Sequence, residues 1–325
     1  MKRTLAAFAG CIILVFGCSK SAENEELTPL ESTTDFSTHR CASHEVLQEQ
    51  LQQDPGLAAR MNEIESVITY IERNPTAGRR VGDIIEIPVV VNVLYKTAAQ
   101  NISDAQIQSQ IAVLNKDFQA TNTDYNNTPS TFQGVRAGDT KIRFVFSKTV
   151  RKATSKKSWT TNNYMKKSAR GGIDPTNPTT TLNMWSCNMG GGILGYAQFP
   201  GGSSATDGVV IDDNAFGNTG TAAAPYGLGR TATHEVGHWL NLRHIWGDAT
   251  CGNDFVTDTP VAQSSNGGCP AFPKYGSCSS TVPMMTMNYM DYTYDACMYM
   301  FTVGQNTRMQ ASFAAGGGRN SFAQP

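Results

Sequence analysis

Three histidines and one glutamate stand close together in the segment 234–244. His234 and His238 are four residues apart, so on a helix their side chains project from one face and can share a metal ion. Glu235 can take a proton from a water bound to that metal. His244 comes six residues after His238 and reaches the site only if the chain leaves the helix and turns back. Three neutral imidazoles with an open fourth position are the layout of a catalytic zinc site.

The pair of histidines alone would be weak support, because H-E-x-x-H also occurs by chance on ordinary amphipathic helices. Two observations favour the metal site. Apart from His39 and His44, the chain has no histidine outside this segment, and His244 has the spacing of the extended pattern H-E-x-x-H-x-x-G-x-x-H. Asn241 stands where that pattern has glycine. Since asparagine tolerates a left-handed backbone better than other non-glycine residues, we expect positive φ there.

The sequence before the histidines predicts alternating strands and helices. We expect the metal-binding helix over about 228–240. Residues 85–95 are β-branched and apolar, which indicates a buried strand, and Ser103 opens a helix with one apolar stripe. Residues 141–147, 181–187 and 208–211 predict further strands. The glycine-rich segment 189–202 lacks the Lys and Ser/Thr of a phosphate loop, so we expect tight turns leading into an edge strand. The pattern indicates an α/β fold.

Regular patterning almost disappears after His244. Four cysteines lie in this region, as disulfide partners would, and allow three connectivities: Cys251, Cys269, Cys278 and Cys297. Thr302 and Gln305 fit a capping box that starts a final helix, which we expect to end near the glycines at 316–318.

The N-terminal part predicts export. Residues 1–18 combine Lys2 and Arg3 with an apolar run too short to span a membrane, as in a signal peptide. The run ends in Val-Phe-Gly-Cys at 15–18, which resembles a lipobox with Cys18 as the lipidated residue. Simple secretion with cleavage nearby is the alternative. The eight cysteines fit an oxidising destination.

Residues 19–80 are acidic and contain two helical patterns, one from Ser43, as its cap, to Gln53 and one over 57–73. We interpret 19–80 as a pro-segment with an exposed, cleavable joint at Arg79-Arg80, followed by a catalytic domain over 81–325. The alternative is an ordinary helical subdomain. Net charge is −1 without a basic cluster, which argues against nucleic acid as a partner.

The zinc-binding pattern and the downstream Asn-Tyr-Met-Asp-Tyr at 288–292 resemble the metzincin peptidases, and within them the pappalysin family with its ulilysin- and cytophagalysin-like members. The resemblance extends over about 85–313. It implies a twisted, mostly parallel sheet with the active-site helix, above a loop-rich, disulfide-held lower subdomain with a C-terminal helix. It also implies that His234, His238 and His244 bind Zn²⁺ and that Glu235 acts as general base and then acid.

The same resemblance assigns further residues. Met290 would lie under the histidines as the Met-turn residue, and Tyr292 would stabilise the oxyanion, or else be an aromatic of the cleft wall. The segment 254–260 resembles a calcium-binding stretch, with Asp254, Thr257 and Asp258 as ligands of Ca²⁺. An ion-free turn is the alternative.

Two more residues have open alternatives. Asp295, five residues after Met290, lies where ulilysin-like enzymes place an acidic residue in the S1′ pocket, which would select Arg at P1′, unless it is a loop carboxylate beside Cys297. Cys41 can serve as a cysteine switch on zinc or form a disulfide with Cys187.

The sequence thus predicts a secreted or lipid-anchored zinc endopeptidase that acts on protein or peptide substrates. We expect a monomer whose membrane contact is limited to an N-terminal lipid. The competing hypothesis is a catalytically inactive surface-binding lipoprotein that keeps the fold.

Overall fold

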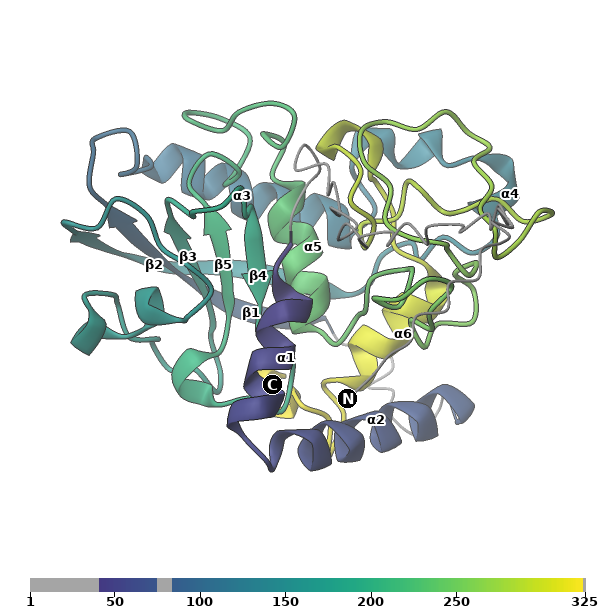
Figure 1. Ribbon diagram of the computed structural model, residues 1–325, viewed down its shortest axis with the longest axis horizontal. Helices are drawn as coiled ribbons and strands as arrows, with labels where there is room; N and C mark the ends of the chain where they lie inside the picture. The colour runs from purple at the N-terminus through teal and green to yellow at the C-terminus, as the bar shows by residue number, and fades with distance from the viewer. Residues whose placement is uncertain (1–40, 75–83, 324–325) are drawn as a thin grey trace, which may run out of the picture. The chain divides into compact units, whose positions relative to one another are not determined.

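A five-stranded sheet is the central element of this computed structural model, which describes residues 41–74 and 84–323 (Figure 1). The strand order is β2-β1-β3-β5-β4. Strands β1 (Ile85–Tyr95), β2 (Ile142–Ala153), β3 (Leu182–Cys187) and β5 (Val209–Asp212) pair in parallel, and β4 (Gly195–Ala197) is the antiparallel edge strand. The expected mostly parallel sheet is confirmed, but the edge strand lies within the glycine-rich segment 189–202 rather than after it. The predicted signal peptide, lipobox and Arg79-Arg80 joint lie outside the described residues.

Strand β2 continues well beyond the predicted end at 147. Its second half pairs with β1 as far as Ala153, but most of its side chains there are exposed or half-buried and several are charged. An edge strand that is not buried lacks the apolar pattern on which the sequence prediction depends.

Two helices cover one face of the sheet. Helix α3 (Asp104–Phe118) begins as predicted, because the Ser103 hydroxyl accepts a hydrogen bond from Gln106 N. Helix α5 (Arg230–Trp239), expected over 228–240, contacts α3, β4 and β5. Alternate residues of β1 such as Val89 and Val91 join the core cluster on this face. The other face packs against a separate cluster that includes Trp159, Met165 and Tyr196.

Two further helices precede the sheet, at the predicted positions. Helices α1 (Ser43–Gln53) and α2 (Leu57–Arg73) contact β4 and the later helix α6, respectively. The predicted capping role of Ser43 is wrong. Ala42 occupies the N-cap position, and the Ser43 hydroxyl instead bonds to Glu235 and to Ala197 N. A tertiary contact has taken the place of the local cap.

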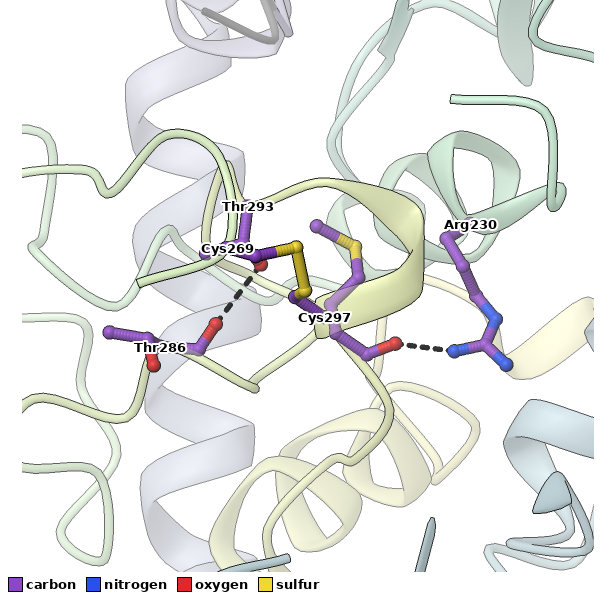
Figure 2. The surroundings of a disulfide bond; sticks show 6 residues. Arg230, Cys269, Thr286, Thr293 and Cys297 are labelled. Atoms are coloured by element: carbon purple, nitrogen blue, oxygen red, sulfur yellow. Dashed lines mark hydrogen bonds between the residues drawn. A yellow bond between two sulfur atoms is a disulfide. The ribbon is translucent and has the colours of Figure 1, made fainter. Parts of the chain in front are cut away.

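The chain after α5 is loop-rich, as expected. Disulfides join Cys251 to Cys278 and Cys269 to Cys297. Figure 2 shows the second bridge beside a hydrogen bond from the Thr293 hydroxyl to Thr286 O. The shorter helices of the described chain are α4 (Ser130–Gln133), η1 (Thr123–Asn127), η2 (Tyr164–Lys166), η3 (Ser168–Arg170), η4 (Ser204–Thr206), η5 (Asp295–Cys297) and η6 (Asn320–Phe322).

Helix α6 (Val303–Ala311) begins with the predicted capping box of Thr302 and Gln305. It ends earlier than expected, at Ala311 rather than near residues 316–318. The chain turns back there, since Arg319 N donates to Ser312 O and the Arg319 side chain is buried against Asp207. In the described ranges, no helix is both long and apolar enough to span a bilayer.

Candidate active site

The three predicted histidines converge on one point. Their Nε2 atoms lie 3.1 Å (His234–His238), 3.3 Å (His234–His244) and 3.0 Å (His238–His244) apart. Four tetrahedral ligands at about 2.0–2.1 Å from zinc would be roughly 3.3 Å from one another. All three side chains are buried, with at most 1% of their surface exposed. The spacing therefore fits one small tetrahedral cation.

The hydrogen bonds of the other ring nitrogens identify which nitrogen is free. His234 Nδ1 lies 2.6 Å from Tyr289 O, and His238 Nδ1 lies 2.8 Å from Leu242 O. His244 Nδ1 is bonded to the Asp248 carboxylate. A carbonyl or carboxylate can only accept, so each Nδ1 carries the proton and each Nε2 presents a lone pair. Three lone pairs at this distance repel unless a cation lies between them.

The turn after α5, which brings His244 back to the other two histidines, has the predicted backbone geometry. Asn241 has φ +72°, in the left-handed region that the glycine of the pattern would otherwise supply. Asn241 N and Leu242 N donate to His238 O and Gly237 O, which closes the end of α5. The departure from glycine is thus accommodated without changing the position of the third histidine.

Met290 lies directly beneath this helix and is completely buried. A Cβ on Gly237 would lie only 2.5 Å from the Met290 sulfur, so the glycine between the two histidine positions permits the close approach. Met290 therefore forms an apolar floor without offering its sulfur to the metal position.

Glu235 is buried beside the histidines, and burial raises the pKa of its carboxyl to about 8. Its Oε2 accepts hydrogen bonds from the Ser43 hydroxyl at 2.7 Å and the Cys41 thiol at 3.4 Å. Its Oε1 has no hydrogen-bond partner among the described residues. A Cβ on Gly195 of β4 would come within 3.1 Å of Oε1, so this glycine leaves room for the carboxylate.

The chain at the start of α1 occupies the same site. The sulfur of Cys41 and one nitrogen from each histidine lie within 4.8 Å of one another. Cys41 forms a parallel bridge with Gly195, and Ala42 N donates to Gly195 O at 3.0 Å. The Tyr292 hydroxyl donates to Cys41 O at 3.1 Å. The Cys41 sulfur therefore lies beside the three histidine nitrogens, with its backbone held along the edge strand.

The alternative partner of Cys41 is not used. Cys41 and Cys187 both have free, buried thiols, and Cys187 lies in β3 near Met189, with 3.7 Å between the two sulfurs. The alternative disulfide is therefore not formed, and the cysteine switch stays a prediction.

Several known proteins are similar to this chain in sequence and in fold. A family model described as Peptidase_M43, pregnancy-associated plasma protein-A, matches residues 194–314. The extracellular metalloprotease 1 of Coccidioides posadasii is 32% identical over 242 residues, which cover 70% of this chain and 78% of that protein. An extracellular metalloprotease of Pyricularia oryzae is 35% identical over 232 residues, which cover 69% of this chain and 72% of that protein.

Two solved structures from Tannerella forsythia are more similar still. A promirolysin mutant is 43% identical, covers 88% of this chain and 97% of that chain, and has a TM-score of 0.80. Mature mirolysin in complex with a cleaved peptide is 47% identical, covers 75% of this chain and 97% of that chain, and has a TM-score of 0.73. This chain belongs to the pappalysin family. It is a zinc metalloendopeptidase, as the sequence predicted.

The predicted specificity residue of this pappalysin lies in η5 and packs against the start of α5. Asp295 is fully buried, and its Oδ2 accepts hydrogen bonds from Leu228 N at 2.8 Å and Arg230 N at 3.2 Å. Burial raises the pKa of its carboxyl to about 6. Oδ1 has no hydrogen-bond partner in the described ranges. One oxygen is thus bound to the backbone at the start of α5, and the role of Asp295 in specificity stays a prediction.

The predicted calcium residues are engaged in protein hydrogen bonds. The Asp254 carboxylate accepts from Val256 N and from the Thr259 hydroxyl. Asp258 accepts from the Thr302 hydroxyl and Gly304 N at the start of α6. Thr257 is exposed. These contacts show how the loop is tied to α6, and calcium binding stays a prediction.

Two residues that contact the site were not among the predicted ones. Asp248 orients His244 and also lies 3.3 Å from His44 Nδ1 in α1. Its position four residues after His244 was a usable sequence signal, because a carboxylate commonly accepts from the second nitrogen of a metal-binding histidine. Ser43 had no such signal, since its contact with Glu235 spans 192 residues of sequence.

Proposed function

We propose that this pappalysin is an exported proenzyme that hydrolyses peptide bonds in proteins with Glu235 as general base, and that residues 19–80 are the pro-segment that keeps it latent. The convergence of three Nε2 lone pairs beside Glu235, with Cys41 at the remaining position, is the observation that carries this proposal.

The side chains around the site have complementary roles in the proposed reaction. Zinc, when bound by the three histidines, polarises the scissile carbonyl and acidifies water. Glu235 accepts the proton of the attacking water and passes it to the leaving nitrogen. Burial raises the pKa of Tyr292 well above its usual value, so its hydroxyl keeps its proton and can donate to a negative oxygen. The hydroxyl already donates to a carbonyl, that of Cys41, in this structure.

Latency is supported by how Cys41 and Ser43 occupy the site. The thiol lies within 4.8 Å of the three histidine nitrogens, the Ser43 hydroxyl bonds to Glu235, and Ala42 pairs with the edge strand, which we propose a peptide substrate would use. The proenzyme relative covers 88% of this chain and the mature relative 75%, a share that matches the length of residues 81–325. We propose removal of the segment by the enzyme itself at Arg79-Arg80.

The direct test compares the wild type with Glu235→Gln, which keeps the size of the side chain but not the base. The wild type should process itself and cleave a peptide library, while Glu235→Gln should do neither and still bind zinc stoichiometrically. Equal absence of cleavage in both proteins would favour the inactive surface-binding lipoprotein. Processing of Glu235→Gln at the same joint would show that another protease activates the chain.

Specificity for Arg at P1′ is proposed on the free oxygen of Asp295. A buried carboxylate with one unpartnered oxygen would select a guanidinium in the adjoining subsite. Library profiling of Asp295→Asn beside the wild type tests this, with Asp139→Asn as the control for charge. Unchanged arginine preference would remove Asp295 from the pocket. Lipid attachment at Cys18 is a separate proposal, tested by mass spectrometry of the exported N-terminus.

A further inference from the structure

Helix α2 is bound to the catalytic part by a contact that is separate from the metal site. Figure 1 shows α2 beside α6, and the two helices touch. Three isoleucines spaced four and three residues apart, on one face of α2, pack in a cluster with Ala311 of α6: Ile64, Ile68 and Ile71. The contact is thus an amphipathic helix laid against a second helix.

Arg308 of α6 is the polar centre of this contact. Its side chain is only 1% exposed. Its two terminal nitrogens bind both oxygens of Glu65, at 3.0 and 2.8 Å, and one of them also binds Glu72 at 3.3 Å. The same guanidinium donates to Phe255 O at 3.2 Å, so Arg308 connects α2 to the loop 254–260 as well as to α6.

The two glutamates are not equivalent. Glu65 makes the paired, planar arrangement that suits a guanidinium best. Glu72 makes a single longer bond, and burial raises the pKa of its carboxyl even though Arg308 acts in the opposite direction. Since Glu65 makes two hydrogen bonds to the guanidinium and Glu72 only one, Glu65 is the stronger partner.

This contact includes none of the metal-binding side chains, although Glu65 also accepts a hydrogen bond at 3.5 Å from Asn241 of the histidine turn. Both contacts hold the same segment. Cys41 is 24 residues before Glu65, and α1 lies between them. Two independent contacts on one segment act together, because while one is closed the other can re-form without diffusion. We propose that Arg308 and the apolar face of α6 form a second, metal-independent anchor, which keeps the pro-segment bound after the chain is cut and returns Cys41 to the metal site.

The inference rests on the proposed function only in treating residues 41–74 as the pro-segment. It defines the partner that the α6 face fits, namely an amphipathic helix with two acidic residues seven positions apart. It also means that a single cut at the joint does not activate the enzyme at concentrations where the segment stays bound.

The test severs the chain without using its own activity. A recognition site for an external protease is inserted between Asn74 and Ile84 in a Glu235→Gln chain, and the cut protein is diluted with zinc or with a chelator. Gel filtration and native mass spectrometry then measure the fraction of pro-segment still bound. We expect the pro-segment to stay bound when the chelator is present and when Cys41 is replaced by alanine. Glu65→Gln should weaken its binding at least tenfold, and Glu72→Gln should weaken it less.

Glu63→Gln is the matched control, because Glu63 is an exposed acid on the same helix. Arg308→Lys adds a second variant that keeps the charge but not the two-pronged geometry, and it should weaken retention as Glu65→Gln does. Complete release of the segment from the cut Glu235→Gln chain on chelation, or equal retention in Glu65→Gln and Glu63→Gln, would overturn the proposal. Neither outcome depends on proteolysis, so failure of the proposed function remains distinguishable.

Discussion

The part of the chain before the histidines and the part after them are stabilised in different ways. Residues 85–239 contain the mostly parallel sheet and helices α3 and α5, which cover one of its faces, with apolar side chains at regular intervals. Residues 245–300 contain one three-residue helix in the described chain. Their buried methionines join the same core, but two disulfides and buried polar side chains hold the backbone. The comparison shows that one core can be closed by repetitive pairing on one side and by individual bonds on the other.

Asp291 illustrates the individual bonds of the second part. It is fully buried and accepts hydrogen bonds from the backbone and side-chain nitrogens of Asn266 and from Tyr292 N. Asn288 exchanges hydrogen bonds with Gln305 of α6 in the same manner. Each such contact replaces several ladder hydrogen bonds, so a single substitution should matter more here than in the sheet.

The largest effect is expected where the two parts meet, at His244. His244→Ala should abolish zinc retention and proteolysis in the processed enzyme, because no other described residue can replace the third ligand. Metal analysis and a peptide assay would measure this, with far-ultraviolet circular dichroism to show that both parts remain folded. The processed wild-type enzyme is the control, because processing removes the remaining histidines of the pro-segment. Stoichiometric zinc and full activity in His244→Ala would refute the ligand assignment.

Removing a disulfide should destabilise the second part of the chain more than the sheet. Replacing Cys269 and Cys297 by alanine opens a link between residues 28 apart, which by chain entropy stabilises folding by about 3–4 kcal/mol. Hydrogen exchange should rise in residues 251–297 before it rises in β1 and β3. The comparison of the two parts would fail if exchange increased equally in the sheet.

A substitution of Asp248 should lower zinc affinity and activity more than it lowers the stability of either part of the chain. Asp248→Asn removes the carboxylate that holds His244, and such changes typically cost about 10–100-fold in metal affinity or activity. Zinc dissociation and kcat/KM of the processed enzyme are the measurements, with Asp139→Asn as the charge control. An unaltered zinc affinity would mean that the turn at Asn241 alone positions the histidine.

The smallest effect is expected from calcium. With zinc in excess and calcium at about ten times its dissociation constant, binding would contribute about 1.4 kcal/mol, or roughly 3–5 °C in melting temperature. Thr257→Ala should reduce this increment, and it is a better probe than a change of Asp258, which also bonds to the start of α6. If neither calcium nor Thr257→Ala changes the melting temperature, the loop is an ordinary turn without an ion.

The sequence predicted the first part of the molecule and the metal group well. Strand β1 and helices α1, α2 and α3 follow from their apolar patterns, and the histidine spacing specified helix α5 and the turn at Asn241. Their signals are local. The pairing of the disulfides, the end of α6 and the partner of Ser43 depend on residues distant in the chain. Sequence periodicity carries no information on such long-range contacts. The sequence therefore left the disulfide pairing open and gave a wrong end for α6 and a wrong role for Ser43.

The triplet Cys41-Ala42-Ser43 suggests a template for inhibitors. Within three residues it offers a sulfur to the metal position, a backbone amide to Gly195 and a hydroxyl to Glu235. A thiol-based inhibitor that carries a hydroxyl two residues further on would engage both the metal and the general base. Its selectivity would come from Ala197, whose backbone nitrogen donates to that hydroxyl at 2.8 Å, because the spacing between metal and edge strand must match the compound.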